Sequence, residues 1–164
     1  MSTTASNDLG EAFRRAVEDC QRQGTIDASL AVTGDAREMH PVVRDEVYRI
    51  GYEAIRNAYT HSRGSRVDVA LTYGHGFTLR VADDGVGMES TVAERGKEGR
   101  FGLPGMRERA ARIGATLSVT SGLGTGTAII VTVPGRVIFR KASTRRAERI
   151  QSMLSWTDET PTLH

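Results

Sequence analysis

Two stretches of the chain alternate apolar and polar residues, and each is divided near its middle by glycines. In "SRVDVALTYGHGFTLRVADD" two alternating runs meet around Gly74-His75-Gly76, and "ATLSVTSGLGTGTAIIVTVPG" repeats the arrangement around Gly122–Gly126. A period of two predicts strands that bury one face, and a glycine turn between two such runs predicts a β-hairpin. The rest of the chain must therefore supply an apolar cover for one face of a sheet.

Three helical patterns can supply that cover. The longest, "PVVRDEVYRIGYEAIRNAYTHS", holds for about six turns and begins at Pro41, because a helix accepts proline at its first position. Its predicted buried stripe consists of Val43, Val47, Ile50, Ala54, Ile55 and Ala58. "DLGEAFRRAVEDCQRQG" places Leu9, Phe13, Ala16, Val17 and Cys20 on one face and stops at Gly24. "GLPGMRERAARIG" predicts a third helix that ends at Gly114.

A further strand is predicted in "TIDASLAVTG", with Ile26, Ala28, Leu30 and Val32 on one face. The order is then helix, strand, helix, hairpin, loop, helix, hairpin, without an internal repeat. This order predicts an α+β fold, a two-layer α/β sandwich with helices on one face of a mixed, mostly antiparallel sheet. We expect the domain to span residues 9–135, between a disordered tail over residues 1–8 and a basic extension over residues 136–164.

Composition narrows the function classes. A net charge of +2 gives no support for nucleic-acid binding. The lone Cys20 cannot form an internal disulfide, and Cys/His spacing typical of metal sites is missing, which favours a reducing cytoplasmic setting. The sequence contains neither a signal peptide nor an apolar run approaching the roughly 18 residues of a membrane span.

The long helix carries the first candidate site. Glu53, Asn57 and His61 are spaced i, i+4 and i+8, so they share one face over successive turns. A carboxylate and an amide oxygen at this spacing could share a hydrated divalent cation, since Mg²⁺ takes oxygen ligands and keeps several waters. A solvated helix face is the alternative, because Glu and Asn are common there.

The second candidate site is "VADDGVGMES", where Asp83 and Asp84 leave an apolar strand and Gly85 and Gly87 follow. A carboxylate at a strand end can accept a hydrogen bond from an amino group of a planar ligand, and glycine lets that ligand approach the backbone. The alternative is a turn and nothing more, because Asp-Gly is an ordinary turn pair.

The third candidate site is "GRFGLPGMRERA", in which Gly102 and Gly105 open a helix. The free N–H groups at a helix N-terminus suit phosphate oxygens. The segment follows no strand directly and lacks the ending of a P-loop, so it matches neither common phosphate-binding fingerprint. A flexible loop with a helix start remains the alternative.

The last hairpin contributes "SGLGTGT". Gly124 and Gly126 could be turn glycines only, and the Thr127 hydroxyl could face a pocket or satisfy a neighbour. Each of these four signals is modest alone, whereas their order and spacing together are specific.

The four motifs resemble the N, G1, G2 and G3 boxes of the GHKL ATPases, the superfamily of type II topoisomerases, heat-shock chaperones, mismatch-repair ATPases and histidine kinases. The resemblance covers about residues 9–135. "DEVYRIGYEAIRNAYTHS" and "GLPGMRERAARIGATLSV" look most like sensor histidine kinases of the nitrate-sensor and desaturase-regulator type. The fold implied is the Bergerat-type sandwich, with ATP between the helices and the sheet.

The resemblance also implies a nucleotide site. Asp83 would accept the adenine amino hydrogen, Gly85 and Gly87 would permit the close approach, and Thr127 would support adenine recognition. The nucleotide-binding residues carried over are Asn57, His61, Asp83, Gly85, Gly87, Gly102, Leu103, Gly124, Gly126 and Thr127.

The same resemblance assigns the chemistry. Asn57 would hold Mg²⁺, and Glu53 would be the general base that orients or deprotonates the attacking group. Gly102 and its neighbours would cover the phosphates, and residues 88–101 would form the mobile lid. Such chemistry is mostly positioning and charge neutralisation.

The chain departs from the family pattern in two respects. Thr60 stands where a Lys or Arg usually precedes the N-box His, and Arg56, Arg63 or His61 could compensate. The phosphoacceptor segment, a His followed by Asp or Glu on a dimerising helix, is also missing. None of the four histidines has that setting, and only about 40 residues precede the N-box helix at Pro41. We therefore expect a catalytic domain cut from a longer protein, which does not autophosphorylate in isolation.

The implied function is transfer of the ATP γ-phosphate to a histidine on a dimerisation domain outside this chain. The implied partners are ATP, that phosphoacceptor domain and a downstream response regulator, with no nucleic acid. We expect this domain to be monomeric and cytoplasmic, and its parent to be homodimeric and membrane-anchored. Two alternatives stay open at this point: a serine kinase of the anti-sigma-factor type, and a nucleotide-binding module without transfer activity.

Overall fold

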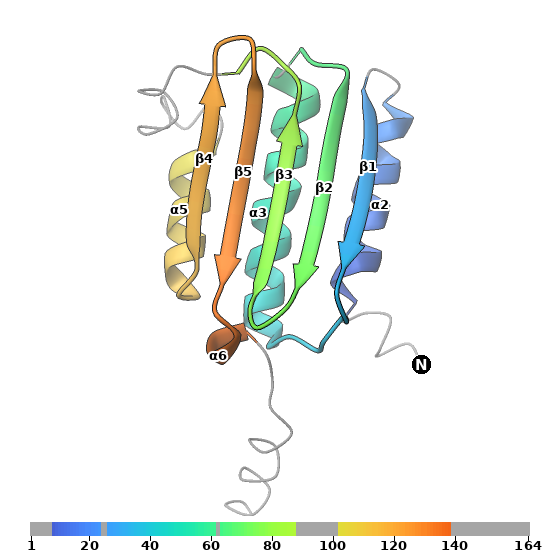
Figure 1. Cartoon of the computed structure of the whole chain (residues 1–164). Helices are drawn as coiled ribbons and strands as arrows, with labels where there is room; N and C mark the ends of the chain where they lie inside the picture. The colour runs from blue at the N-terminus through green and yellow to red at the C-terminus, as the bar shows by residue number, and fades with distance from the viewer. Residues whose placement is uncertain (1–7, 24–25, 62, 88–101, 139–164) are drawn as a thin grey trace, which may run out of the picture.

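The computed structural model describes residues 8–23, 26–61, 63–87 and 102–138 of the chain (Figure 1). The expected tail before Asp8, the expected lid and most of the basic extension lie outside these ranges. In chain order the elements are α2 (Leu9–Arg22), β1 (Asp27–Thr33), α3 (Pro41–His61), β2 (Arg66–Tyr73), β3 (Phe77–Asp83), α5 (Leu103–Arg112), β4 (Thr116–Gly122), β5 (Gly126–Val133) and α6 (Gly135–Ile138).

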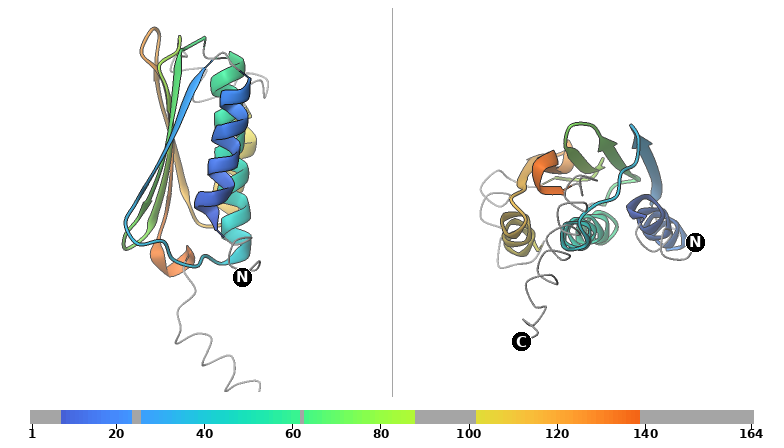
Figure 2. Two further views of the ribbon diagram at one scale, coloured as in Figure 1. Left: turned by 90° about the vertical axis from the view of Figure 1, so that its right-hand side faces the viewer. Right: turned by 90° about the horizontal axis from the view of Figure 1, so that it is seen from below.

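The five strands form one sheet in the order β1-β2-β3-β5-β4. β1 pairs with β2 in parallel, and the other three pairs are antiparallel. Helices α2, α3 and α5 cover a single face of the sheet (Figure 2). This arrangement confirms the α+β sandwich with a mixed, mostly antiparallel sheet. It also places β5 beside β3, so that the two predicted hairpins join into one sheet.

The hydrophobic core lies between the sheet and α3. The helix buries the stripe predicted from its spacing, and Val47 and Ile50 are completely inaccessible to solvent. The inward side chains of the central strands meet it, with Leu71, Leu79 and Val131 also inaccessible. Cys20 on α2 is buried with them, as expected. One continuous core therefore holds both layers together.

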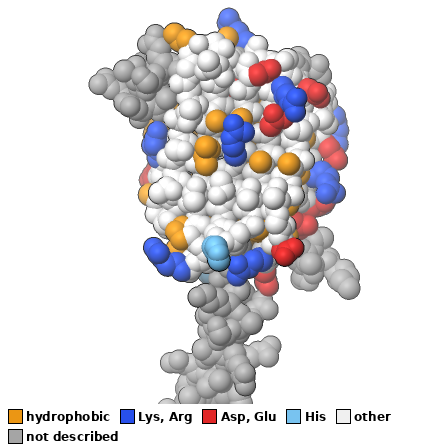
Figure 3. Space-filling view, viewed as in Figure 1, with side chains coloured by type: hydrophobic (Ala, Val, Ile, Leu, Met, Phe, Trp, Pro, Cys, Tyr) orange, Lys and Arg blue, Asp and Glu red, His pale blue; other side chains and the backbone are white. Residues whose placement is uncertain are grey.

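The other face of the sheet carries small and polar side chains. Outward positions on the central strands include Ala70, Thr72, Arg80, Ala128 and Thr132. Figure 3 views this face, where scattered hydrophobic and charged side chains lie among other groups. The alternating apolar and polar residues of the sequence thus lie on different faces of the sheet: the apolar residues face the helices, and the others lie on the face that the helices leave uncovered.

A close approach between α2 and α3 depends on a glycine. A Cβ added at Gly51 would overlap the Cε1 and Cζ atoms of Phe13 and would lie 3.0 Å from Cδ2 of Leu79. Phe13 itself is completely buried and packs against Tyr48, with 5.2 Å between ring centroids. Gly51 therefore makes room for the aromatic side chain that joins α2 to the core.

One detail departs from the predictions. Val32 lies on the predicted face but is 47% exposed, because it sits near the end of the edge strand β1. The short helix α6 follows Pro134, and its Val137 packs against the core. Among the described residues, none of the helices has the length and apolarity needed to cross a bilayer.

The contact between Gly51 and Phe13 gives a stability prediction. Gly51→Ala should lower the free energy of unfolding by about 1–3 kcal/mol, because an extra carbon is forced into a packed core. Gly105→Ala is the matched control, since a Cβ at this helical glycine meets nothing within 4 Å. The control should stabilise by up to about 1 kcal/mol through helix propensity. Urea unfolding of both variants measures the difference, and a stabilised Gly51→Ala would contradict the packing.

Candidate functional site

The motif residues converge at one end of the sandwich. β3 runs to this end and β5 starts there, so that Asp83 and Thr127 are direct partners in the antiparallel ladder. The second half of α3 and the start of α5 lie behind them in the helix layer (Figure 1). Segments far apart in the sequence therefore bring the predicted site residues to one edge of the fold.

Asp83 is a half-buried carboxylate at the centre of this edge. Its Oδ1 accepts a hydrogen bond from the backbone N–H of Gly85, 2.9 Å away, and the N–H of Thr127 also donates to it. Burial nevertheless raises the pKa of Asp83 above 3.8, and the charge of Asp84 adds to the rise. The site therefore holds a poorly solvated acceptor that would gain from a further hydrogen-bond donor.

Asp84 has the opposite environment. Its carboxylate accepts hydrogen bonds from the Ser65 hydroxyl at 2.7 Å, the Ser65 N–H at 2.8 Å and the Arg66 N–H at 2.9 Å. These bonds, the Ser65 hydroxyl first, lower the pKa of Asp84. Asp84 therefore holds the connection between α3 and β2 against the end of β3. This agrees with the interpretation of Asp84 as a residue that stabilises the turn.

The glycines around Asp83 make close backbone contacts within the chain. Gly87 and Gly126 both have positive φ, and a Cβ would overlap the carbonyl oxygen of Gly122 at the first and of Asp83 at the second. The N–H of Gly124 donates to the carbonyl oxygen of Val86 at 2.7 Å. The segment after β3 and the β4–β5 turn are thus locked together by backbone packing. A role of these glycines in ligand approach stays a prediction.

Thr127 faces the helix layer beside Asp83. Its hydroxyl and that of Ser121 on the neighbouring strand β4 lie 2.8 Å apart, and either could be the donor. The Ser121 hydroxyl also donates to the carbonyl oxygen of Gly126. The Thr127 hydroxyl is therefore oriented by its neighbour, so both alternatives left open for it are compatible: it has a partner and it stands at the candidate site.

The helix side of the site is built from α3 and α5. Glu53, Asn57 and His61 are all half-buried on α3. Gly102, with φ of 67°, caps α5, and a Cβ there would lie 3.1 Å from Cγ and Oε1 of Glu53. The start of α5 thus packs directly on the predicted base. Leu103 is 1% exposed, so it could serve a ligand only through its backbone.

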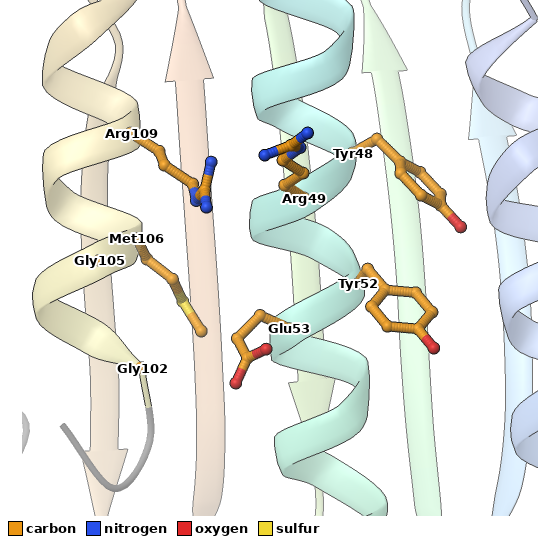
Figure 4. A pocket seen from close by; sticks show the side chains of 8 residues that line it. All are labelled: Tyr48, Arg49, Tyr52, Glu53, Gly102, Gly105, Met106 and Arg109. Carbon is orange, nitrogen blue, oxygen red and sulfur yellow. The ribbon is translucent and has the colours of Figure 1, made fainter.

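A cavity of about 350 Å³ opens between α3 and α5 (Figure 4). It is lined by Tyr48, Arg49, Tyr52, Glu53, Gly102, Gly105, Met106 and Arg109. Figure 4 shows the carboxylate of Glu53 and the side chain of Met106 between the two helices, with the guanidinium groups of Arg49 and Arg109 facing one another above them. The cavity meets the predicted site only at Glu53 and Gly102.

Most of these lining residues were not singled out in the sequence. Arg49 lies four residues before Glu53, so helical spacing alone would have placed it on the same face. Arg109 lies seven residues after Gly102, two turns along α5. Counting helix faces from the motif residues could have found both, whereas the pairing of the two faces needed the tertiary structure.

The described residues contain no group of three or more His, Cys, Asp or Glu side chains that could hold a metal ion. Asn57 offers an amide oxygen on the same helix as Glu53, and oxygen is the ligand that Mg²⁺ prefers. The donor set thus fits a metal that receives most of its ligands from a bound phosphate and from water.

Comparison with known proteins gives consistent matches. The profile of the family "Histidine kinase-, DNA gyrase B-, and HSP90-like ATPase" matches residues 42–137. "Sensor protein VraS" of Staphylococcus saprophyticus is 34% identical over 77% of this chain and 35% of its own length. "Sensor histidine kinase LiaS" of Bacillus subtilis is 32% identical over 80% of this chain and 36% of its own. The chain therefore spans about a third of the curated relatives that it matches.

Solved structures agree on the fold. The histidine kinase domain of a blue-light activated kinase from Erythrobacter litoralis has a TM-score of 0.62, with 25% identity over 78% of this chain and 61% of that one. The ATP-binding domain of PrrB from Mycobacterium tuberculosis has a TM-score of 0.65, with 21% identity over 78% of this chain and 94% of that one.

The opposite shifts of the two adjacent acids give a prediction about stability and pH. A raised folded-state pKa means that ionising Asp83 costs folding stability, and this cost sets in as the pH rises from about 3.8 through the raised pKa. Asp83→Asn removes this cost. Without ligand, the thermal midpoint of the variant minus that of wild type should therefore grow as the pH rises through the raised pKa, and it should be positive at neutral pH.

Asp84→Asn is the matched control. The pKa of Asp84 is lowered, so its ionised form contributes stability that is lost as the pH falls through the lowered value. This variant should melt below wild type at pH 7, and the gap should close on acidification. Equal and pH-independent changes in the two variants would contradict the assignment.

Proposed function

Because the chain belongs to the family of histidine kinase-, DNA gyrase B- and HSP90-like ATPases, we propose that it binds Mg-ATP and transfers the γ-phosphate to a histidine on a separate domain. It is the ATP-binding catalytic domain of a histidine kinase, homologous to the sensor kinases VraS, LiaS and DegS. The narrower likeness to the nitrate-sensor and desaturase-regulator branch stays a prediction.

One observation carries the nucleotide proposal: a half-buried carboxylate with a raised pKa stands at a strand end between two structural glycine turns. In the proposed complex the adenine amino group donates to Asp83 and so supplies the donor that this acceptor lacks. Thr127, already fixed beside Asp83 by the strand pairing, supports the same contact. Gly85, Gly87, Gly124 and Gly126 form the backbone around the base.

The phosphates are proposed to lie at the helix end of the site. Gly102 and Leu103 begin α5 there, and their N–H groups and the helix dipole favour phosphate oxygens. Asn57 and His61 lie on the second half of α3, which ends at His61. Asn57 would hold Mg²⁺, which neutralises phosphate charge when bound.

Glu53 is proposed as the general base. An imidazole nitrogen of the acceptor histidine forms a bond to the γ-phosphorus while the bond to the ADP oxygen breaks, and the imidazole proton passes to the Glu53 carboxylate. The contact of Gly102 with Glu53 supports this role, because it places the base where the phosphate-binding helix starts. Proton transfer to a positioned carboxylate contributes typically about 10²–10⁴-fold to a rate.

The partners are proposals as well. The relatives are named as sensor proteins, which supports a parent kinase with a phosphoacceptor domain and a downstream response regulator. The same names favour a histidine acceptor over the serine acceptor of an anti-sigma-type kinase. We place this domain on the cytoplasmic side of a membrane-anchored, homodimeric parent.

Calorimetric titration with a non-hydrolysable ATP analogue, with and without Mg²⁺, tests the nucleotide site. Wild type should bind in the millimolar range or tighter, and Mg²⁺ should strengthen binding. Asp83→Asn should abolish it, because an amide has a single acceptor oxygen. If that oxygen accepts from the backbone N–H groups of Gly85 and Thr127, the amide NH2 faces the adenine amino group, and if it faces the base, the NH2 meets the backbone donors. Asp84→Asn is the neighbouring control and should keep wild-type affinity. An unchanged affinity of Asp83→Asn for the ATP analogue would contradict the proposal that Asp83 binds the adenine amino group.

Transfer is tested with the histidine-bearing dimerisation domain of the parent kinase added to this chain. Glu53→Gln should retain ATP affinity and lose about 10²–10⁴-fold in transfer rate, since the amide cannot take the proton. Formation of acid-labile phosphohistidine on the added domain measures the rate. Undiminished transfer by Glu53→Gln would show that Glu53 is not the base, and self-labelling of the chain alone would contradict the need for a separate acceptor.

A further inference from the structure

A carboxylate on α3 holds two arginines of α5, outside the residues assigned to the nucleotide. Glu46 Oε1 accepts a hydrogen bond from Arg109 Nη1 at 3.3 Å, and Glu46 Oε2 lies 3.8 Å from Arg112 Nη1. The Glu46 side chain is 13% exposed, against 33% for Arg109 and 59% for Arg112. The contact joins residues 63 positions apart in the sequence for the closer pair.

Arg109 is the closer of the two partners of Glu46. At 3.8 Å the Arg112 contact is too long for a hydrogen bond, and Oε2 is buried without a hydrogen-bond partner within the described part of the chain. Arg109 therefore provides the main compensation for a largely buried carboxylate. Removal of one partner from such a pair leaves an uncompensated charge, so the contact is strongly preferred over its separation.

The ion pair and the contact between Gly102 and Glu53 are the same number of residues apart on both helices. Glu46 precedes Glu53 by seven residues on α3, and Gly102 precedes Arg109 by seven residues on α5. Since Glu46 meets Arg109 and Glu53 meets Gly102, the helices run antiparallel with the same span of about 10.5 Å between the two contacts. The cavity between the helices lies along this span (Figure 4).

Apolar packing also holds α5 in place, because Leu103, Met106 and Ala110 are buried in the core. The ion pair is directional, because a guanidinium donor must reach a particular carboxylate oxygen. A shift of α5 by one helical turn would break it and would also move Gly102 away from Glu53.

We propose that Glu46 and Arg109 are positioning residues for phosphoryl transfer: their ion pair sets the placement of α5 along α3 and so holds Gly102 against Glu53, two turns away. The inference rests on the proposed roles of Glu53 and Gly102. Neither Glu46 nor Arg109 is among the residues assigned to the nucleotide or to the base. Their effect should appear in the transfer step, whereas adenine recognition depends on β3 and β5.

Three variants test the pair. Glu46→Gln removes the charge with little change of shape, Arg109→Met keeps the apolar stem, and Arg109→Lys keeps the charge on a single nitrogen. Glu11→Gln, which disrupts the exposed pair between Glu11 and Arg14, is the control ion pair. The measurements are the affinity for adenosine, the transfer kcat at saturating Mg-ATP with the added dimerisation domain, and the NMR signal of the Met106 methyl group, which is buried and lines the cavity between the helices.

Glu46→Gln and Arg109→Met should lower kcat by about 10- to 100-fold, the scale expected when catalytic groups are misplaced by an ångström or less. Their affinity for adenosine, which has no phosphate, should stay within about twofold of wild type, a change far below that scale, and the Met106 signal should move. Arg109→Lys should recover most of kcat, and Glu11→Gln should change none of the three measurements. Wild-type kcat in Glu46→Gln overturns the inference, as does a loss of kcat matched by an equal loss of adenosine affinity.

The experiment distinguishes failure of the proposed function from failure of the inference about the placement of α5. A wild-type chain that phosphorylates no added acceptor contradicts the proposed transfer, and the Met106 signal then decides the inference about placement. A signal unmoved in Glu46→Gln and Arg109→Met overturns it, and a signal moved in both but not in Arg109→Lys supports it.

Discussion

The packing of α3 against the middle of the sheet is the constraint on which the other features depend. Val47 and Ile50 are completely buried against inward side chains of the central strands. The neighbouring Gly51 lets Phe13 of α2 reach the same core. Because a helix has several faces, the one that stays out of this core is free to carry Glu53 and Asn57 toward the site. One face of α3 thus packs in the core, and another face carries the candidate catalytic and metal-binding residues.

The sheet supplies the other half of the site through its strand order. β5 lies next to β3, so Asp83 and Thr127 become ladder partners although 44 positions separate them. Asp83 is half-buried at this edge and keeps a raised pKa despite two backbone donors, whereas Asp84 is stabilised by Ser65 and Arg66. A half-buried acid with a raised pKa is a common feature of binding sites, because functional sites often hold charges in poorly solvated places.

Much of this arrangement could be predicted from local pattern. The boundaries of α3 and the burial of Cys20 followed from helical spacing. The separate roles of Asp83 and Asp84 came from the family resemblance and stay a prediction. The contact of Glu46 with Arg109 was missed because each is an ordinary helix residue until the two helices pack.

The sequence by itself determined the elements, the buried faces and the motif residues, because periodicity and glycine turns act over a few neighbouring positions. Only the tertiary structure decided that β1 pairs in parallel at the edge, that β5 inserts beside β3, and that Gly102 rests on Glu53. Those outcomes depend on contacts between segments far apart in the chain. Their energies come from shared burial and from pairs such as Glu46 with Arg109, which no local window contains.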